Sequence, residues 1–245
     1  MANAALEEYR YQQGILEASV FEVMRLLVSR VIHRGPEQVR EMIIAVQPSL
    51  VELYGEVAAE LAVEFYRASL PDESTFIPLP APVSKSTGEA LEKSARYHAG
   101  ALFAGETDQA IDAMISSATK HIRDRGRETM VYNAEREGVG WARVPRGDKT
   151  CAWCLALASR GAVYASKKTA SASKTSDDHG YHAHCDCEVV RIGADESYPM
   201  EYLPDEALEM WEQARDQADD PGDIKSVLAQ MRRLYPQAVT DGVTE

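Results

Sequence analysis

Two groups of cysteine and histidine residues, about thirty positions apart, constrain what this chain can fold into. The first is CAWC, residues 151–154, and the second is the run from His179 to Cys187, which contains HAHCDC. All four cysteines and three of the six histidines of the 245-residue chain stand in these two groups. Two thiolates separated by two residues in a tight turn can bind one tetrahedral ion, because the turn directs both sulfur atoms the same way. We therefore predict one metal site built from two distant segments.

The sequence leaves the ligand set open. If CDCEVV is a strand, Cys185 and Cys187 project from one face and can both reach an ion beside the sheet. His182 could fold over from the preceding turn, whereas His184 alternates to the opposite face if the strand starts that early. The competing ligand sets are Cys151, Cys154, Cys185 and Cys187, or the same set with His182 replacing one distal cysteine. Such thiolate-rich sites are closed and leave no position for water, so we expect a structural zinc ion.

Other interpretations of the cysteines remain. They are four buried thiols without metal, a metal-free hydrogen-bonded knot descended from a metal site, and a thioredoxin-like redox pair at Cys151 and Cys154. The redox pair is disfavoured because the chain lacks the alternating strand–helix pattern that hosts it. Disulfides are disfavoured because the N-terminus does not resemble a signal peptide, and an intracellular product keeps its thiols reduced. No HExxH or HxE-plus-PCxxC pattern supplies a general base, so we expect no enzyme.

The predicted fold class is α+β and mainly α. Apolar spacings of three, four and seven predict long helices, the first ending near Gly35, another starting near Pro48, and one over 107–137 that Gly126 interrupts. Short β-like runs (WARVP, AVYAS and CEVVRI) follow Trp141. The longest apolar run has about five residues, so we expect no membrane span. The expected segments are a helical arm (1–70), a proline-rich linker (71–85), a Cys/His-stapled α+β domain (86–195, with a surface loop at 166–178) and an acidic helical tail (196–245).

Charge is unevenly distributed along the chain. The net charge of −13 argues against a protein that coats nucleic acid indiscriminately. Residues 120–149 nevertheless carry eight Lys/Arg against five acids, and 195–223 carry eleven acids against one arginine. The basic block is a candidate contact with DNA phosphates. We expect the acidic helix 205–220 to lie on protein or face solvent, with Leu208 and Trp211 as its apolar contacts. The candidate DNA-contacting residues are Arg123, Arg125, Arg127 and Arg143.

The region around the cysteines resembles a known family. GWARVPRGDKTCAWCLALASRGAVY, followed by YHAHCDCEV, is similar to the minor head proteins of tailed phages, the Mu F-like minor capsid proteins, in the form found in phages of actinobacteria. The resemblance covers about residues 86–193. The positions that carry the pattern are Arg143, Cys151, Cys154, Gly161, His182, Cys185 and Cys187.

The resemblance implies a virion component present in few copies. Such a protein would associate with the portal inside the phage head and help head assembly or genome delivery. Its expected partners are the portal protein, other head proteins and packaged double-stranded DNA, with no membrane. Its expected location is the head interior, and the host cytoplasm during assembly. The alternative functions are a DNA-contacting head protein that uses the 120–149 block and, third, a zinc-dependent enzyme.

Overall fold

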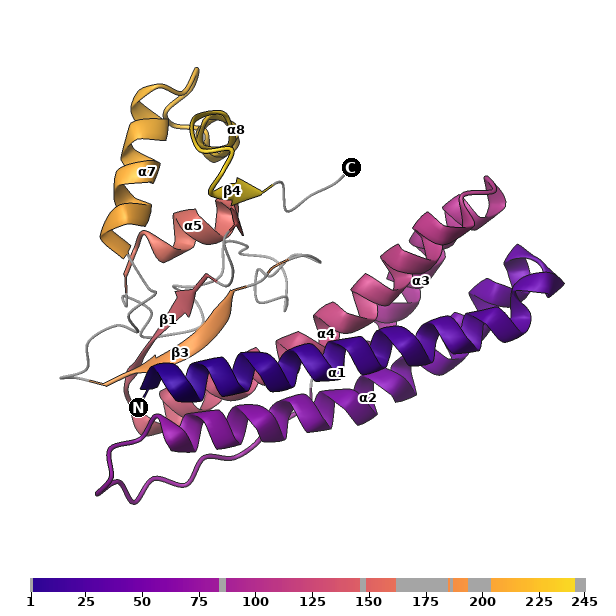
Figure 1. Ribbon diagram of the computed structural model, residues 1–245, viewed down its shortest axis with the longest axis horizontal. Coiled ribbons are helices and arrows are strands. Elements are labelled where there is room, and N and C mark those ends of the chain that lie inside the picture. Colours follow the sequence, from indigo (N-terminus) through magenta and orange to yellow (C-terminus); the bar gives the residue numbers. More distant parts are fainter. Residues whose placement is uncertain are drawn as a thin grey trace. The chain divides into compact units, whose positions relative to one another are not determined.

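The computed structural model describes residues 2–83, 87–145, 149–161, 185, 187–193 and 204–240 (Figure 1). The chain forms two compact units, Asn3–Thr129 and Met130–Glu245. Long helices dominate, and short strands form two small sheets, so the predicted α+β, mainly α class is confirmed. The expected strand AVYAS, the surface loop 166–178, His182 and His184 lie outside the described residues.

Four long helices supply the first unit, and Figure 1 shows them along one another. They are α1 (Ala2–Val31), α2 (Pro36–Ala68), α3 (Thr87–Phe103) and α4 (Thr107–Glu137), with the 3-10 helix η1 (Ile32–Arg34) after α1. Gly35 has φ 105° and ψ 172° between η1 and α2, a conformation that L side chains rarely adopt. Pro36 then occupies the first turn of α2, where its missing N–H costs no hydrogen bond. The expected end of the first helical segment near Gly35 is confirmed.

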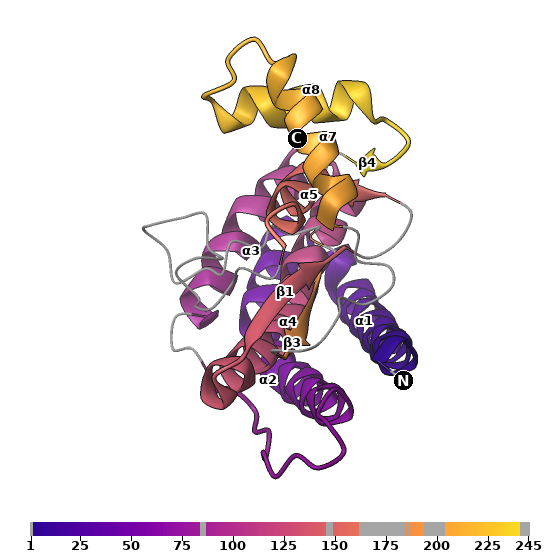
Figure 2. The ribbon, with the colours of Figure 1, turned by 90° about the vertical axis from the view of Figure 1, so that its left-hand side faces the viewer.

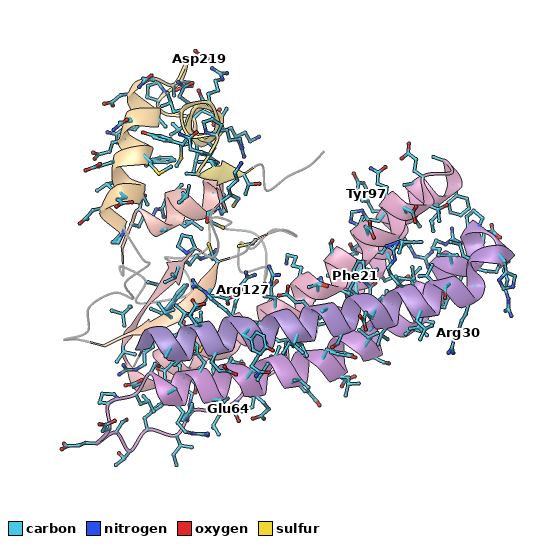
Figure 3. All side chains as sticks on the ribbon, in the orientation of Figure 1. Phe21, Arg30, Glu64, Tyr97, Arg127 and Asp219 are labelled. Atoms are coloured by element: carbon cyan, nitrogen blue, oxygen red, sulfur yellow. The ribbon has the colours of Figure 1, made fainter. Side chains whose placement is uncertain are left out.

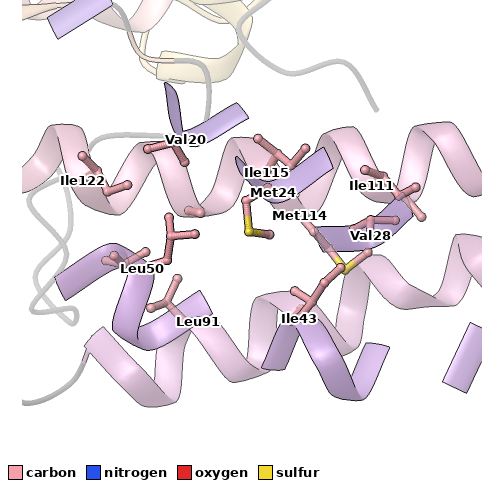
Figure 4. Close-up of a cluster of buried hydrophobic side chains, with 14 of the residues drawn as sticks. Val20, Met24, Val28, Ile43, Leu50, Leu91, Ile111, Met114, Ile115 and Ile122 are labelled. Atoms are coloured by element: carbon pink, nitrogen blue, oxygen red, sulfur yellow. The ribbon is translucent and has the colours of Figure 1, made fainter. Parts of the chain in front are cut away.

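The core of the first unit is a stripe of aliphatic side chains from all four helices (Figure 4). Each helix contributes residues three or four positions apart, which is the spacing that brings side chains to one face. Met24 of α1, Ile43 of α2, Met114 of α4 and Ala95 of α3 are each fully buried there. This shared core, more than local propensity, stabilises helices of such length.

The helix expected to begin near Pro48 in fact begins at Pro36, so that expectation is wrong. Pro48 stands inside α2, where a proline costs about 3 kcal/mol. Buried residues on both sides, Ile43, Leu50 and Val51, continue the same core face through the proline, and their packing outweighs the local penalty. By length and composition alone α2 would also be able to cross a membrane. In this structure 39% of its apolar window is buried, and buried residues of the helix belong to the four-helix core.

The proline-rich segment does not separate two bodies, because residues 71–83 pack on the helices of the first unit. Arg125 of α4 donates hydrogen bonds to the carbonyl oxygens of Ala81 (3.0 Å) and Pro82 (3.2 Å). The N–H of Ala81 donates to the hydroxyl of Thr129 at 3.2 Å. The chain instead divides after Thr129, inside α4, so its compact units differ from the four segments expected from the sequence.

Gly126 does not interrupt α4, which continues to Glu137; the predicted interruption is wrong. A Cβ atom at position 126 would lie 2.6 Å from the hydroxyl of Tyr9 and 3.3 Å from the carbonyl oxygen of Ala58. Tyr9 cannot easily move away, because its ring stacks on Phe65 with centroids 4.7 Å apart. The glycine therefore allows α1, α2 and α4 to approach closely.

The second unit contains β1 (Gly140–Val144) and β3 (Glu188–Ile192), the strands that the WARVP and CEVVRI runs predicted. The two strands pair antiparallel. A second sheet pairs β2 (Thr150–Cys151) in parallel with β4 (Val239–Thr240). Among the described residues of this unit, the end of α4 is followed by α5 (Ala152–Ala158), α7 (Pro204–Asp216) and α8 (Ile224–Leu234), and these last three pack on one another (Figure 2).

The C-terminal segment is part of this second core and not a separate tail. Ala152 and Ala156 of α5 pack with Ala214 of α7 and Met231 of α8. Trp211 packs against the same cluster, as expected. Leu208, the other expected contact, is 39% exposed, because Ala207 and Ala214 define the buried face of α7 instead.

We predict that Gly126→Ala destabilises the first unit by about 1–3 kcal/mol, because the added methyl group overpacks the contact with α1 and α2. Gly100→Ala in α3 is the matched control, since no atom lies within 4 Å of a Cβ at that exposed position. The control should stabilise by about 0.5–1 kcal/mol. Chemical denaturation of both variants measures the difference. Equal stabilisation by both substitutions would show that the close approach is absent.

Candidate metal centre

The first half of the candidate centre lies where β2 meets α5. Cys151 is the N-cap of α5 with extended backbone (φ −64°, ψ 145°), and its sulfur accepts the backbone N–H of Cys154 at 3.3 Å. The turn of helix between them brings Cys154 back toward Cys151, as expected for this spacing. The packing of Ala152 and Ala156 in the core fixes the direction of α5 and so the position of the Cys154 sulfur.

The second half directly precedes β3. Cys187 is the residue before the strand, and Cys185 stands two positions earlier. The strand is held by its register with β1, which pairs Val144 with Glu188 and Arg143 with Val189. Cys185 and Cys187 are 1% and 0% exposed, so both thiols lie inside the unit.

The two halves meet at a buried cluster of sulfur atoms. The sulfurs of Cys154 and Cys185 are 3.2 Å apart. The ligand atoms of Cys154, Cys185 and Cys187 all lie within 4.8 Å of one another, a group that could hold a metal ion. Zinc–sulfur bonds are about 2.3 Å long, so sulfurs on one tetrahedral ion are separated by roughly 3.8 Å. The cluster thus has the dimensions of a thiolate site.

The electrostatics of the cluster explain why it would favour a cation. Hydrogen bonds with the sulfurs of Cys151, Cys185 and Cys187, in that order, and then burial, raise the pKa of the Cys154 thiol well above its ordinary value. Without a cation the crowded sulfurs therefore keep Cys154 protonated. A divalent ion reverses this balance, since it stabilises thiolates and releases their protons.

The structure brings together three of the five predicted ligands in one mutual group. They are Cys154, Cys185 and Cys187, and all three belong to the all-cysteine ligand set expected from the sequence. Cys151 is 2% exposed and contacts Cys154, but it is outside the mutual group. His182 lies outside the described residues, so the choice between the two ligand sets expected from the sequence stays open.

An ion pair that the sequence did not indicate fixes β3 from the other side. Arg191 Nε donates to Glu137 Oε2 at 2.7 Å, and a second guanidinium nitrogen donates to Oε1. Both side chains are largely buried, and such a bidentate pair sets geometry as well as energy. Only an opposite-charge match 54 positions apart could have hinted at it, and many such matches exist in a charged chain.

The arginines proposed for DNA contact are directed into the protein. Arg123 forms a bidentate ion pair with Glu17 of α1 at 2.7–2.8 Å. Arg127, labelled in Figure 3, is 1% exposed and donates to Asp124 at 3.0 Å. Arg125 is 9% exposed, and Arg143 on β1 is 1% exposed. Phosphate binding needs accessible cations, so the geometry favours structural roles for these four residues.

Fold and site together define a class, a mainly helical protein with a thiol cluster that could hold a metal. The sequence profile of the VG15 protein family matches residues 1–214, and the chain belongs to that family. It is similar to the "Gene 15 protein" of Mycobacterium phage L5, 33% identical over 112 residues. It is also similar to the "Gene 15 protein" of Mycobacterium phage D29, 25% identical over 130 residues. The chain is therefore a member of a phage protein family, which implies a virion or infected-cell setting.

These alignments cover only part of each protein. The match to the phage L5 protein covers 33% of this chain and 38% of the relative, and the match to the phage D29 protein covers 42% and 47%. The chain therefore spans less than half the length of the curated relatives it matches. No solved structure matches it.

We predict that Arg125→Leu destabilises the first unit by about 1–3 kcal/mol, because it removes the donors that satisfy two carbonyl oxygens of the 71–83 segment. Proteolysis within that segment should accelerate in parallel. Arg34→Leu, at an exposed arginine beside α2, should leave stability within about 0.5 kcal/mol of the unmodified chain. Thermal melting and limited proteolysis provide the measurements. Unchanged melting combined with lost duplex binding would restore Arg125 as a DNA contact.

Proposed function

We propose that this chain is a structural minor head protein of a tailed phage, of the Mu F-like type, and that it acts inside the head beside the portal. Membership of a phage family and similarity to mycobacteriophage gene products support the phage setting. The motif from Arg143 to Cys187 supports the finer assignment. Its role is to assist head assembly or genome delivery through protein contacts, and not to catalyse a reaction.

The buried sulfur cluster is the observation that carries this proposal. CAWC and CDC are the distinctive part of the resemblance, and they meet at 3.2 Å between Cys154 and Cys185. A motif whose residues converge in the interior serves folding, because buried thiols offer no open position to a substrate. The ion we assign to the cluster is zinc, held by Cys154, Cys185, Cys187 and either Cys151 or His182.

Zinc in this position would act as a cross-link. The strands described in the second unit are short, with two or five residues each. Metal binding supplies folding free energy in small domains. The ion would join α5 to the segment that enters β3, and hold both against the sheet.

The first unit supplies surface for protein partners. Its helices expose large apolar side chains, among them Tyr97, labelled in Figure 3, which is 81% exposed, and Leu53, which is 61% exposed. The portal protein and other head proteins are the partners we propose. Packaged DNA is a lesser candidate partner, because the four arginines that were candidates for binding it are buried or pair with groups of the protein itself. We propose no membrane contact, since α2 contributes one face to a protein core.

We predict about one zinc ion per chain, measured by elemental analysis of protein purified without chelator. Cys154→Ser should abolish zinc binding and the cooperative melting of the second unit, because it removes a ligand from the centre of the cluster. Ala156→Ser is the matched control: it places the same hydroxyl in the same helix, at a residue 6% exposed, without touching a sulfur. The control should retain the ion. A metal-free wild type that melts like the Cys154→Ser variant would exclude the zinc centre.

We predict that the protein is a minor component of purified phage particles and that intact heads protect it from added protease. Disruption of the heads should expose it, and crosslinking before disruption should join it to the portal protein. Quantitative mass spectrometry of particles and of empty heads provides the measurement, with the major capsid protein as the internal standard. Absence from purified particles would contradict the minor head assignment, whatever the outcome for zinc.

A further inference from the structure

We propose that Cys154 and Cys185 form a disulfide bond when an oxidant reaches the metal-free cluster, so that a covalent cross-link replaces the ion. The inference goes beyond the proposed zinc centre, because it depends on the arrangement of the thiols and not on the identity of a metal. It assigns a modification site to the interior of the second unit, between α5 and the segment that enters β3.

The geometry selects this pair of sulfurs. They are in direct contact at 3.2 Å, and a disulfide bond is about 2.05 Å long. Each sulfur therefore has to move by roughly 0.6 Å, which is within the ordinary thermal displacement of ordered atoms. Cys151 also contacts Cys154, but its sulfur lies outside the group of three whose ligand atoms are all within 4.8 Å of one another.

The burial of the two thiols determines how an oxidant can reach them. Both are buried, at 0% and 1% exposure, so reaction requires a small oxidant or a local opening of the unit. A bound divalent ion would hold both sulfurs as ligands and block the reaction. Loss of the ion leaves two adjacent thiols, and oxidation then joins segments that are 31 positions apart.

The chemistry balances with a peroxide as the oxidant. One sulfur, as its thiolate, attacks an oxygen of hydrogen peroxide, breaks the O–O bond and becomes a sulfenic acid, while hydroxide takes up the proton of the thiol as water. The second sulfur attacks the first, the S–S bond forms, and the S–O bond breaks to release a second water. Two thiols and one peroxide thus give one disulfide and two waters, with both sulfurs oxidised and the peroxide reduced.

The setting makes such a bond useful to a phage protein. Thiols stay reduced in the cytoplasm of the host, where metal binding is available to them. A particle outside the cell is in an oxidising environment, in which disulfides persist. The metal ion would cross-link the second unit in the host cytoplasm, and the disulfide bond would cross-link it in the particle outside the cell.

The experiment uses the full chain, stripped of metal with a chelator and treated with hydrogen peroxide under native conditions. Free thiols are then blocked with N-ethylmaleimide, and the protein is digested without reduction and analysed by mass spectrometry. We expect a peptide pair joined through Cys154 and Cys185, an intact mass lower by two hydrogen atoms before blocking, and reversal by dithiothreitol. The oxidised chain should melt about 10 °C above the reduced metal-free chain, because the bond closes a loop in the unfolded state.

Variants separate this bond from other pairings. Cys151→Ser should still form the cross-link, whereas Cys185→Ser should not. A dominant link between Cys151 and Cys154 or between Cys185 and Cys187 in the unmodified chain, or no disulfide at all, would overturn the proposal. Native circular dichroism before oxidation ensures that these results describe the folded chain.

The outcome for zinc is independent of the outcome for the disulfide. Protein loaded with zinc should oxidise at least tenfold more slowly and release the ion as the bond forms, measured with a chromogenic chelator. If the chain binds no zinc but joins Cys154 to Cys185, the metal assignment fails and this inference holds. If zinc binds and peroxide yields no such bond after its removal, this inference fails and the metal assignment holds.

Discussion

The contact between the sulfurs of Cys154 and Cys185 links two parts of the second unit that are 31 positions apart in the sequence. It joins the short helix α5 to the segment that enters β3. The described strands have at most five residues, and α5 has seven. The neighbouring thiols and burial raise the pKa of the Cys154 thiol. The cluster is therefore stable either with a bound cation or with its sulfurs protonated. The same arrangement thereby favours metal binding and, where metal is lost, oxidation.

The first unit obeys a different constraint, the close approach of long helices. Gly126 lets α4 lie against Tyr9 and the backbone of Ala58. The aliphatic side chains of the four helices then form one buried core. Charged residues of α4 take part in this packing. Arg125 binds carbonyl oxygens of the 71–83 segment, and Arg123 pairs with Glu17. These two arginines of the basic block 120–149 thus make contacts within the protein.

Family membership and site geometry lead to compatible conclusions. The VG15 profile covers most of the chain, including helices that carry no motif of their own. The sulfur cluster lies in the interior of one unit. The four arginines that were candidates for binding DNA either pair with groups of the protein itself or are buried. Both observations favour a protein whose site stabilises its own fold and whose surface binds other proteins. This is the reason for proposing a structural role at the portal in place of a catalytic one.

The sequence by itself determined most of the helices, the two strands around Arg143 and Val189, and the pairs of cysteines that supply the sulfur cluster, because these follow from local spacing. Helical period, strand alternation and paired cysteines act over a few residues and leave a readable pattern. Only the tertiary structure decided that Pro48 and Gly126 do not break their helices, that the proline-rich segment packs on α4, and that the C-terminal helices share a core with α5. In each case burial against distant residues outweighed a local preference, and no short stretch of sequence records which distant residues those are.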